Sequence, residues 1–322
     1  MMHISLDIFM TKKKVNVKNS FGADAKVLFH SKPWKNAKGA AVNKPLIMDG
    51  AMGTELMACG VKLPLPLWSA ESNLTDPEIV CAIHKGYVNA GADIIGTNTF
   101  RTTTWTYRKA DYSPKRARER ARASLMKAVE FGRRSNPKIL AGSITSIEDC
   151  YSPELFPGRG AAEDTYGETV DWFNEAGVDV ILFETMGHLD EIDIALQSVN
   201  GQNILLSLIV KDDDHLLSGH SLESVYPMAK DKVDILMLNC NTVAKTDSAL
   251  EGVIENWGGD WGVYPNMGLT EPEPDGEMDE KVDDQSFNKI ISTYLDMSPK
   301  VIGSCCGSSP KHTKIIYKLI NQ

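Results

Sequence analysis

The chain has 322 residues, of which 42% are hydrophobic, and this is enough apolar material for one large core or two smaller ones. Its formal net charge of -9 argues against nucleic acid or an anionic membrane surface as a main partner. No apolar run approaches the roughly 20 residues that a membrane-spanning helix needs. The six cysteines lack paired spacing, which indicates a reducing compartment, and we expect a cytoplasmic protein.

Residues 1–43 differ in composition from the rest of the chain. They are rich in lysine, including the run 12–14, and show no sustained hydrophobic periodicity. They lack the apolar core of a secretory signal, and Asp7 and Asp24 are unusual in a transit peptide. We therefore predict a basic N-terminal extension over 1–43, packed on the outside or partly disordered, with a targeting role as the alternative. Residues 44–322 form the predicted folded domain.

From residue 45 onward, short apolar runs alternate with helical patterns. The first run, 46–48, is followed by a helix start at 75–78, where a capping candidate, an early proline and an acidic residue occur together. Apolar residues then recur four positions apart over 79–87, as on one buried face of a helix, and Gly91 ends the pattern. The same order of helix, glycine and apolar strand is repeated further along the chain.

Eight short apolar strands are predicted in this way. They cover residues 46–48, 92–98, 139–143, 178–184, 204–209, 235–239, 261–264 and 301–302. Continuous apolar strands that alternate with amphipathic helices are typical of a parallel sheet covered on its faces. Eight such units predict an α/β fold with a single (β/α)8 TIM-type barrel. A doubly wound open sheet is the alternative, but no G-x-G-x-x-G pattern follows the first strand.

In a (β/α)8 barrel the active site lies at the C-terminal ends of the strands. Most of the expected strands end in residues that can ionise, form hydrogen bonds or bind a metal. These are Asp49, Thr97 with Asn98, Ser143, Glu184, Cys240, Tyr264, and Cys305 with Cys306. They come from distant parts of the sequence, and the barrel predicts that they meet at one mouth.

The neighbouring thiols of Cys305 and Cys306 could form a redox pair, a strained disulfide, part of the core or a metal site. Cys240 follows another apolar run, and this third thiol in a matching place favours a metal. Three thiolates suit Zn²⁺ and leave one of its four positions open, which is typical of a catalytic zinc. Ordinary buried cysteines remain an alternative, and Cys150 is a rival ligand because it also follows a strand.

Two carboxylates and a turn of small residues could bind an amino acid at the same mouth. Asp49 and Glu184 could bind an ammonium group together, although Asp49 could instead cap a helix and Glu184 could anchor a loop. The backbone N–H groups of Gly50 and Ala51 could donate to a carboxylate. Thr97 could add a hydroxyl group.

Taken together, the motifs resemble the homocysteine S-methyltransferase family, which includes betaine–homocysteine and S-methylmethionine-dependent enzymes. The matching stretches are 49–56, 91–95, 97–100, 184–185, 239–240, 264–266, and Gly303 with Cys305 and Cys306. The resemblance implies that 44–322 is a homocysteine-binding (β/α)8 barrel. It implies zinc on Cys240, Cys305 and Cys306, the amino group at Asp49 and Glu184, and the carboxylate near Gly50, Ala51 and Thr97.

The activity implied by the resemblance is zinc-dependent methyl transfer from a small donor to the thiolate of homocysteine, giving methionine. The donor could be S-methylmethionine, S-adenosylmethionine or betaine. The alternatives are a methyl-corrinoid protein as donor, a different thiol acceptor, or a zinc-binding barrel without turnover. Two departures from the family pattern matter: Ser304 replaces a usual glycine, and residues 142–151 lack the glycine–proline pattern common in sulfonium-using members.

Overall fold

The computed structural model of the chain describes residues 32, 34, 44–272, 276, 278 and 280–322. The chain divides into two units, 1–30 and 31–322, and every described residue belongs to the second. Most of the predicted extension over 1–43 therefore lies outside the described residues, and its boundary at residue 44 stays a prediction.

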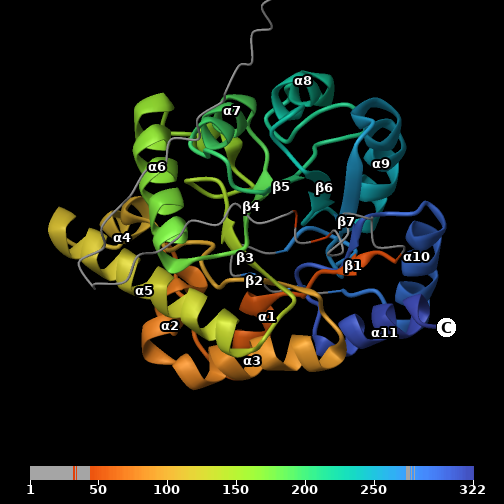
Figure 1. Ribbon diagram of the computed structural model, residues 1–322, viewed down its shortest axis with the longest axis horizontal. Helices are drawn as coiled ribbons and strands as arrows, with labels where there is room; N and C mark the ends of the chain where they lie inside the picture. Colours follow the sequence, from red (N-terminus) through yellow and green to blue (C-terminus); the bar gives the residue numbers. More distant parts are fainter. Residues whose placement is uncertain (1–31, 33, 35–43, 273–275, 277, 279) are drawn as a thin grey trace, which may run out of the picture. The chain divides into compact units, whose positions relative to one another are not determined.

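Eight parallel strands form the centre of the described part of the chain (Figure 1). They are β1 (Leu46–Ile47), β2 (Ile94–Gly96), β3 (Ile139–Ile144), β4 (Val180–Met186), β5 (Ile204–Leu208), β6 (Ile235–Asn239), β7 (Asp260–Tyr264) and β8 (Val301–Ile302). From β2 to β8 each strand pairs with the next in sequence, and β1 pairs with β8. A parallel bridge between Met48 and Ile94 joins β1 to β2, so the ring closes as predicted and the open-sheet alternative is wrong.

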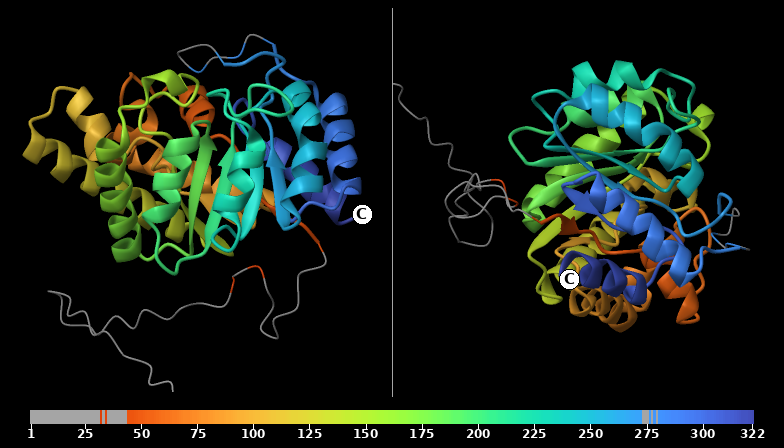
Figure 2. Two further views of the ribbon diagram at one scale, coloured as in Figure 1. Left: turned by 90° about the horizontal axis from the view of Figure 1, so that it is seen from above. Right: turned by 90° about the vertical axis from the view of Figure 1, so that its right-hand side faces the viewer.

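The helices lie outside the ring of strands (Figures 1 and 2). In the described residues they are α1 (Met52–Ala58), α2 (Ser72–Thr75), α3 (Pro77–Ala90), α4 (Thr104–Lys109), α5 (Pro114–Arg134), α6 (Arg159–Ala176), α7 (Leu189–Gln197), α8 (Val225–Ala229), α9 (Val243–Trp257), α10 (Asp284–Asp296) and α11 (Pro310–Ile320). None of the helices in the described part of the chain combines the length and apolar character needed to cross a membrane.

An aspartate before several strands explains the register of the barrel. The carboxylate of Asp93 accepts the backbone N–H of Ile47 in the neighbouring strand at 3.0 Å. Asp179 accepts the N–H of Leu140 at 2.7 Å in the same way, and Asp234 repeats the pattern with Ile204 at 2.9 Å. The repeated sequence unit therefore carries its own alignment signal, because each aspartate fixes the start of the adjacent strand.

Side chains alternate between the inside and the outside of the barrel along each strand. Those that point inward form an apolar interior and, at the C-terminal end, a polar layer. Residues of the strands and their ends form one buried cluster, made of Leu46, Met48, Ile94, Ile139, Ala141, Val180, Leu182, Leu205, Ile235, Met237, Tyr264, Val301 and also Trp34. Side chains two positions further along a strand point the same way. The next inward residues of β3 to β6 are Ser143, Glu184, Ser207 and Asn239, so polar groups gather at the C-terminal end, as predicted.

Two strands differ from their predicted bounds by two residues at each end. β2 covers only 94–96 rather than 92–98, because Asp93 turns its side chain back to Ile47 and Thr97 begins the loop. β4 runs on to Met186, past the predicted end at Glu184, and its pairing with β5 shifts register between Phe183 and Met186. This irregularity lies beside one of the predicted site residues.

Candidate active site

The three predicted metal ligands lie together at the C-terminal end of the barrel. Cys240 follows β6, and Cys305 and Cys306 follow β8. Their sulfur atoms lie within 4.8 Å of one another, with 4.0 Å between those of Cys305 and Cys306. Sulfurs that are each about 2.3 Å from one tetrahedral zinc would be about 3.8 Å apart, so the set fits such an ion after a small contraction. Within the described residues, no other trio of metal-binding side chains is this close.

Asn266 holds the two cysteine-bearing loops against each other. Its Nδ2 donates to the carbonyl of Cys240 at 2.9 Å, and its Oδ1 accepts the N–H of Cys306 at 3.2 Å. The hydroxyl of Tyr151 donates to the same Cys240 carbonyl at 3.1 Å. A fully buried amide that bonds both loops fixes their separation before any metal arrives.

The turn after β8 requires a glycine at 303 but tolerates a serine at 304. A Cβ on Gly303 would lie 2.8 Å from the Cβ of Met48, so no larger residue fits there. Ser304 is buried, and its carbonyl accepts the hydroxyl of Ser308 at 3.3 Å. The prediction that serine at 304 leaves the turn possible is consistent with Cys305 and Cys306 both reaching the cluster.

The thiols perturb one another's acidity. Hydrogen bonds from Cys240 and Cys305 lower the pKa of Cys306 well below its ordinary value. Hydrogen bonds with Cys305 and Cys306, together with burial, raise the pKa of Cys240. A thiolate at Cys306 is thus stabilised by two neighbouring thiols. A metal cation could replace the protons that the three sulfurs share.

Asp49 is a buried carboxyl group, Glu184 is a half-buried one, and the charge of Glu184 acts on Asp49. Burial, together with the charge of Glu184, raises the pKa of Asp49 well above its ordinary value. Burial also raises the pKa of Glu184 to about 7, although the Ser143 hydroxyl that donates to it acts in the opposite direction. Two carboxyl groups that resist ionising together can both ionise once a cation lies between them. The pair therefore suits an ammonium group.

Asp49 is not a helix cap, contrary to the alternative considered from the sequence. The N-cap of α1 is Ala51, which has no side-chain bond. The carboxylate of Asp49 instead accepts the backbone N–H of Gly96 at 3.0 Å. This bond turns the side chain toward β2 and leaves the other carboxylate oxygen without a partner among the described residues.

Two of the other predicted substrate contacts, Ala51 and Thr97, are engaged with the protein itself. The N–H of Ala51 donates to Ser308 Oγ at 3.2 Å, and a Cβ on Gly50 would lie 2.4 Å from that oxygen. The hydroxyl of Thr97 accepts the N–H of Ser143 at 3.2 Å and pairs with the hydroxyl of Thr99 at 2.6 Å. A substrate carboxylate near Ala51 would have to displace Ser308, and the roles of Gly50, Ala51 and Thr97 stay predictions.

Cys150 does not belong to the metal cluster. Its side chain is buried, and its sulfur lies outside the group that Cys240, Cys305 and Cys306 form. Burial raises the pKa of the Cys150 thiol to about 12, so it is a neutral thiol at physiological pH.

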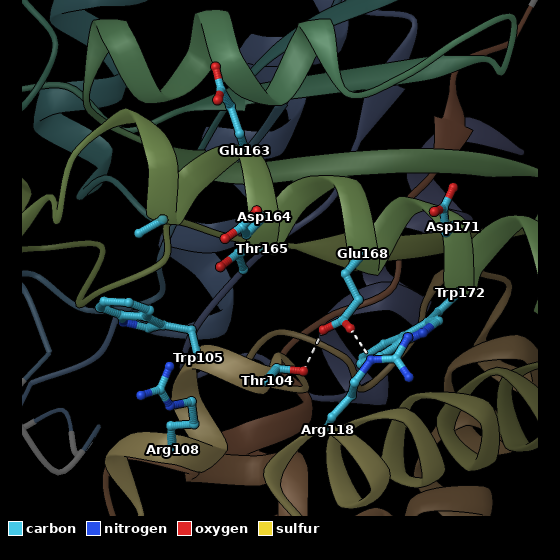
Figure 3. Close-up of a pocket in the computed structure, with 11 residues that line it drawn as sticks. Thr104, Trp105, Arg108, Arg118, Glu163, Asp164, Thr165, Glu168, Asp171 and Trp172 are labelled. Atoms are coloured by element: carbon cyan, nitrogen blue, oxygen red, sulfur yellow. Dashed lines mark hydrogen bonds and ion pairs between the residues drawn. The ribbon is translucent and has the colours of Figure 1, made fainter. Parts of the chain in front are cut away.

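A separate cavity of about 590 Å³ lies on the outside of the barrel between α4, α5 and α6 (Figure 3). It is lined by Thr104, Trp105, Arg108, Arg118, Ala161, Glu163, Asp164, Thr165, Glu168, Asp171 and Trp172. The Arg118 side chain crosses it to pair with Glu168. None of the predicted site residues lines this cavity, so it is not the candidate active site.

Sequence reasoning gave no role to four residues that shape the site. They are Tyr151, Asn239, Asn266 and Ser308. Two of them had a usable signal, because Asn239 and Asn266 each lie at or just after a strand end. The contact of Ser308 with Ala51 joins residues 257 positions apart and has no local signature.

Comparison with known proteins identifies the family. The family model for homocysteine S-methyltransferases matches residues 46–320. The chain is 26% identical to homocysteine S-methyltransferase 3 of Zea mays over 90% of this chain and 93% of that protein. It is 24% identical to a selenocysteine methyltransferase of Astragalus bisulcatus over 85% of this chain and 92% of that protein.

A solved structure supports the fold. The homocysteine methyltransferase MmuM from Escherichia coli, in its metallated form, superimposes with a TM-score of 0.73 at 22% identity and covers 85% of this chain and 96% of its own. The family match spans nearly all of the described barrel and includes all three clustered cysteines. The chain therefore belongs to the homocysteine S-methyltransferase family.

Proposed function

We propose that the protein transfers a methyl group from a small donor to the thiol of homocysteine, using zinc held by Cys240, Cys305 and Cys306. The observation that carries this proposal is the meeting of three thiols with two carboxyl groups of raised pKa at one end of the barrel. The thiols suit a metal that binds a further sulfur, and the carboxyl groups suit the amino group of the same substrate. The metallated form of MmuM from Escherichia coli supports the metal.

Substrate recognition would fall to the residues that follow β1 and to Glu184 on β4. Asp49 and Glu184 would bind the ammonium group, with Ser143 and Tyr264 holding the Glu184 carboxylate from either side. Backbone N–H groups at Gly50 and Ala51 would receive the carboxylate. Together these contacts place the amino acid so that its thiol end extends toward the cysteine cluster.

The chemistry needs the acceptor as a thiolate, because the neutral thiol is a poor nucleophile. Zinc bound by the three cysteines supplies Lewis acidity that favours the thiolate at neutral pH. The acceptor proton goes to solvent, the acceptor sulfur forms a bond to the methyl carbon, and the bond between that carbon and the donor breaks. The donor leaves as a neutral thioether or amine.

The loop over 145–151 follows β3 and contacts the candidate site. Tyr151 from this loop reaches Cys240, and the buried Glu191 accepts the N–H of Ile147 at 2.7 Å. These contacts hold the loop in place although it lacks the glycine–proline pattern. Because that pattern is absent, S-methylmethionine, S-adenosylmethionine and betaine all stay candidates for the donor. A methyl-corrinoid protein is the alternative donor.

A selenol acceptor is the second candidate function. Two relatives are named as selenocysteine methyltransferases, from Astragalus bisulcatus and from Brassica oleracea. Selenocysteine carries the same amino and carboxylate groups as homocysteine on a shorter chain, so the same carboxyl pair could bind it. We also propose a reducing, cytoplasmic setting, since all six cysteines are free and the cluster binds metal only when reduced.

A donor screen with isotope-labelled methyl groups tests the function. Zinc-loaded protein, homocysteine and one donor at a time are incubated, and labelled methionine is measured by mass spectrometry. We expect one small donor to label methionine, with selenocysteine as a parallel acceptor. If neither a small donor nor a methyl-corrinoid protein yields product from fully loaded protein, the chain is a zinc-binding barrel without turnover.

A further inference from the structure

The side chain of Asn239 joins the two halves of the site. Asn239 ends β6 and is fully buried. Its Oδ1 accepts the backbone N–H of Thr185 at 2.9 Å, and its Nδ2 donates to Thr185 Oγ1 at 3.1 Å and to Cys240 Sγ at 3.4 Å. The Thr185 N–H can only donate, so the amide oxygen must face it. The amide N–H groups must then face the hydroxyl and the sulfur.

Both residues that contact this amide have strained backbones. Thr185 has φ of 59° and Cys240 has φ of 54°, a left-handed conformation that side chains other than glycine rarely adopt. For threonine, which is β-branched, the conformation is especially unfavourable. Such residues persist only where surrounding contacts enforce them, and here one amide bonds to both.

Each strained residue is next to a residue of the proposed chemistry. Thr185 directly follows Glu184, at the place where β4 shifts its register against β5. Cys240 directly follows Asn239 and is a predicted metal ligand. A change in either turn would therefore move a carboxylate or a sulfur, and the amide of Asn239 is common to both turns.

We propose that Asn239 is a positioning residue that couples the amino-acid pocket to the metal site. Its oxygen end fixes the turn that directs Glu184 into the barrel, and its nitrogen end donates to the sulfur of Cys240. The inference rests on the proposed function, because it assigns those two residues their roles. Asn239 touches neither substrate nor metal in this account and acts through its neighbours.

The two ends of the amide make separable contributions. Removing a residue that orients a metal ligand typically weakens metal binding about 10- to 100-fold. Asn239→Ala removes both ends, so zinc affinity and the preference for an amino-bearing thiol should both fall. Asn239→Asp keeps an acceptor for the Thr185 N–H but replaces the donor to sulfur with oxygen, so zinc affinity should fall while the preference for the amino group is retained.

The test compares these variants with a matched control. Asn73→Ala and Asn73→Asp change another buried asparagine, whose amide bonds to Asn98 and Ser124 and to no cysteine. Zinc affinity is measured by competition with a chelator, without any turnover. The absorption of the cobalt-substituted protein reports sulfur ligation, and binding of homocysteine is compared with binding of 4-mercaptobutanoate, its analogue without the amino group.

We expect the Asn239 variants to bind zinc at least tenfold more weakly than the Asn73 variants, with an altered cobalt spectrum. Asn239→Asp, which conserves shape, decides the matter if Asn239→Ala does not fold. Wild-type zinc affinity in Asn239→Asp overturns the inference. Failure of the wild-type protein itself to bind zinc or to prefer homocysteine would count against the proposed function instead.

Discussion

Replacing Glu184 with glutamine removes a charge while leaving the local structure in place. The carboxylate of Glu184 accepts a hydroxyl from Ser143 and another from Tyr264, the latter at 3.5 Å. A glutamine side chain of the same shape can still accept through its one oxygen, and it no longer attracts an ammonium group. The three cysteines are unchanged, so the variant should keep its metal.

The size of the effect follows from the lost charged hydrogen bond. Such a bond contributes about 1.5–3 kcal/mol, which corresponds to about 10- to 150-fold in affinity for homocysteine. 4-Mercaptobutanoate lacks the amino group and should lose nothing. The ratio of the two affinities should therefore fall by about 10- to 150-fold in Glu184→Gln.

The assay measures both dissociation constants at matched zinc content and about one pH unit above the Glu184 pKa of about 7. Glu191→Gln is the control, because Glu191 is a buried glutamate, more buried than the half-buried Glu184, that accepts bonds from Ile147 and Tyr166. An unchanged ratio in Glu184→Gln would show that Glu184 is a structural anchor and refute its assignment to the ammonium group.

Three further predictions address the metal, the pH dependence and the fold. Cys306→Ala should reduce zinc well below one ion per chain in elemental analysis, and full retention of metal would remove Cys306 from the ligand set. Because burial raises the pKa of Glu184 to about 7, its carboxyl is neutral below that pH. The preference for homocysteine over its deamino analogue should thus weaken as pH falls through 7, by up to about tenfold per unit, and a flat profile would contradict this. Trp34 is 1% exposed in the inner cluster, so Trp34→Ala should cost about 3–5 kcal/mol in urea unfolding, and a change below about 1 kcal/mol would show that the indole is not part of the core.

Much of the barrel could be predicted from repeated local signals. The glycines at 91 and 177 end helices in a left-handed conformation, and an aspartate two residues later begins the next strand in both places. Within a few residues, each such unit specifies where a helix ends, where the next strand starts and how that strand aligns with its neighbour. The strand ends then indicate where Cys240 and Glu184 meet, because a closed parallel barrel brings those ends together.

The features that sequence reasoning missed depend on contacts between distant segments. The amide of Asn239 reaches Thr185 only because β4 and β6 flank β5, and no local pattern predicts the strained turns it holds. The burial of Trp34 in the inner cluster was also missed, since one indole in a basic segment without periodicity resembles a chance aromatic. The occupation of the Ala51 N–H by Ser308 likewise requires the folded ring.

X-ray absorption at the zinc edge, recorded with and without homocysteine, tests most directly whether the cysteine cluster receives the acceptor thiol. Three sulfur ligands at about 2.3 Å are expected in the loaded protein alone. A fourth sulfur at a similar distance is expected when homocysteine is added. A sulfur count that stays at three, or that is below three at the start, would contradict the assignment of Cys240, Cys305 and Cys306 as the site where the substrate thiol binds.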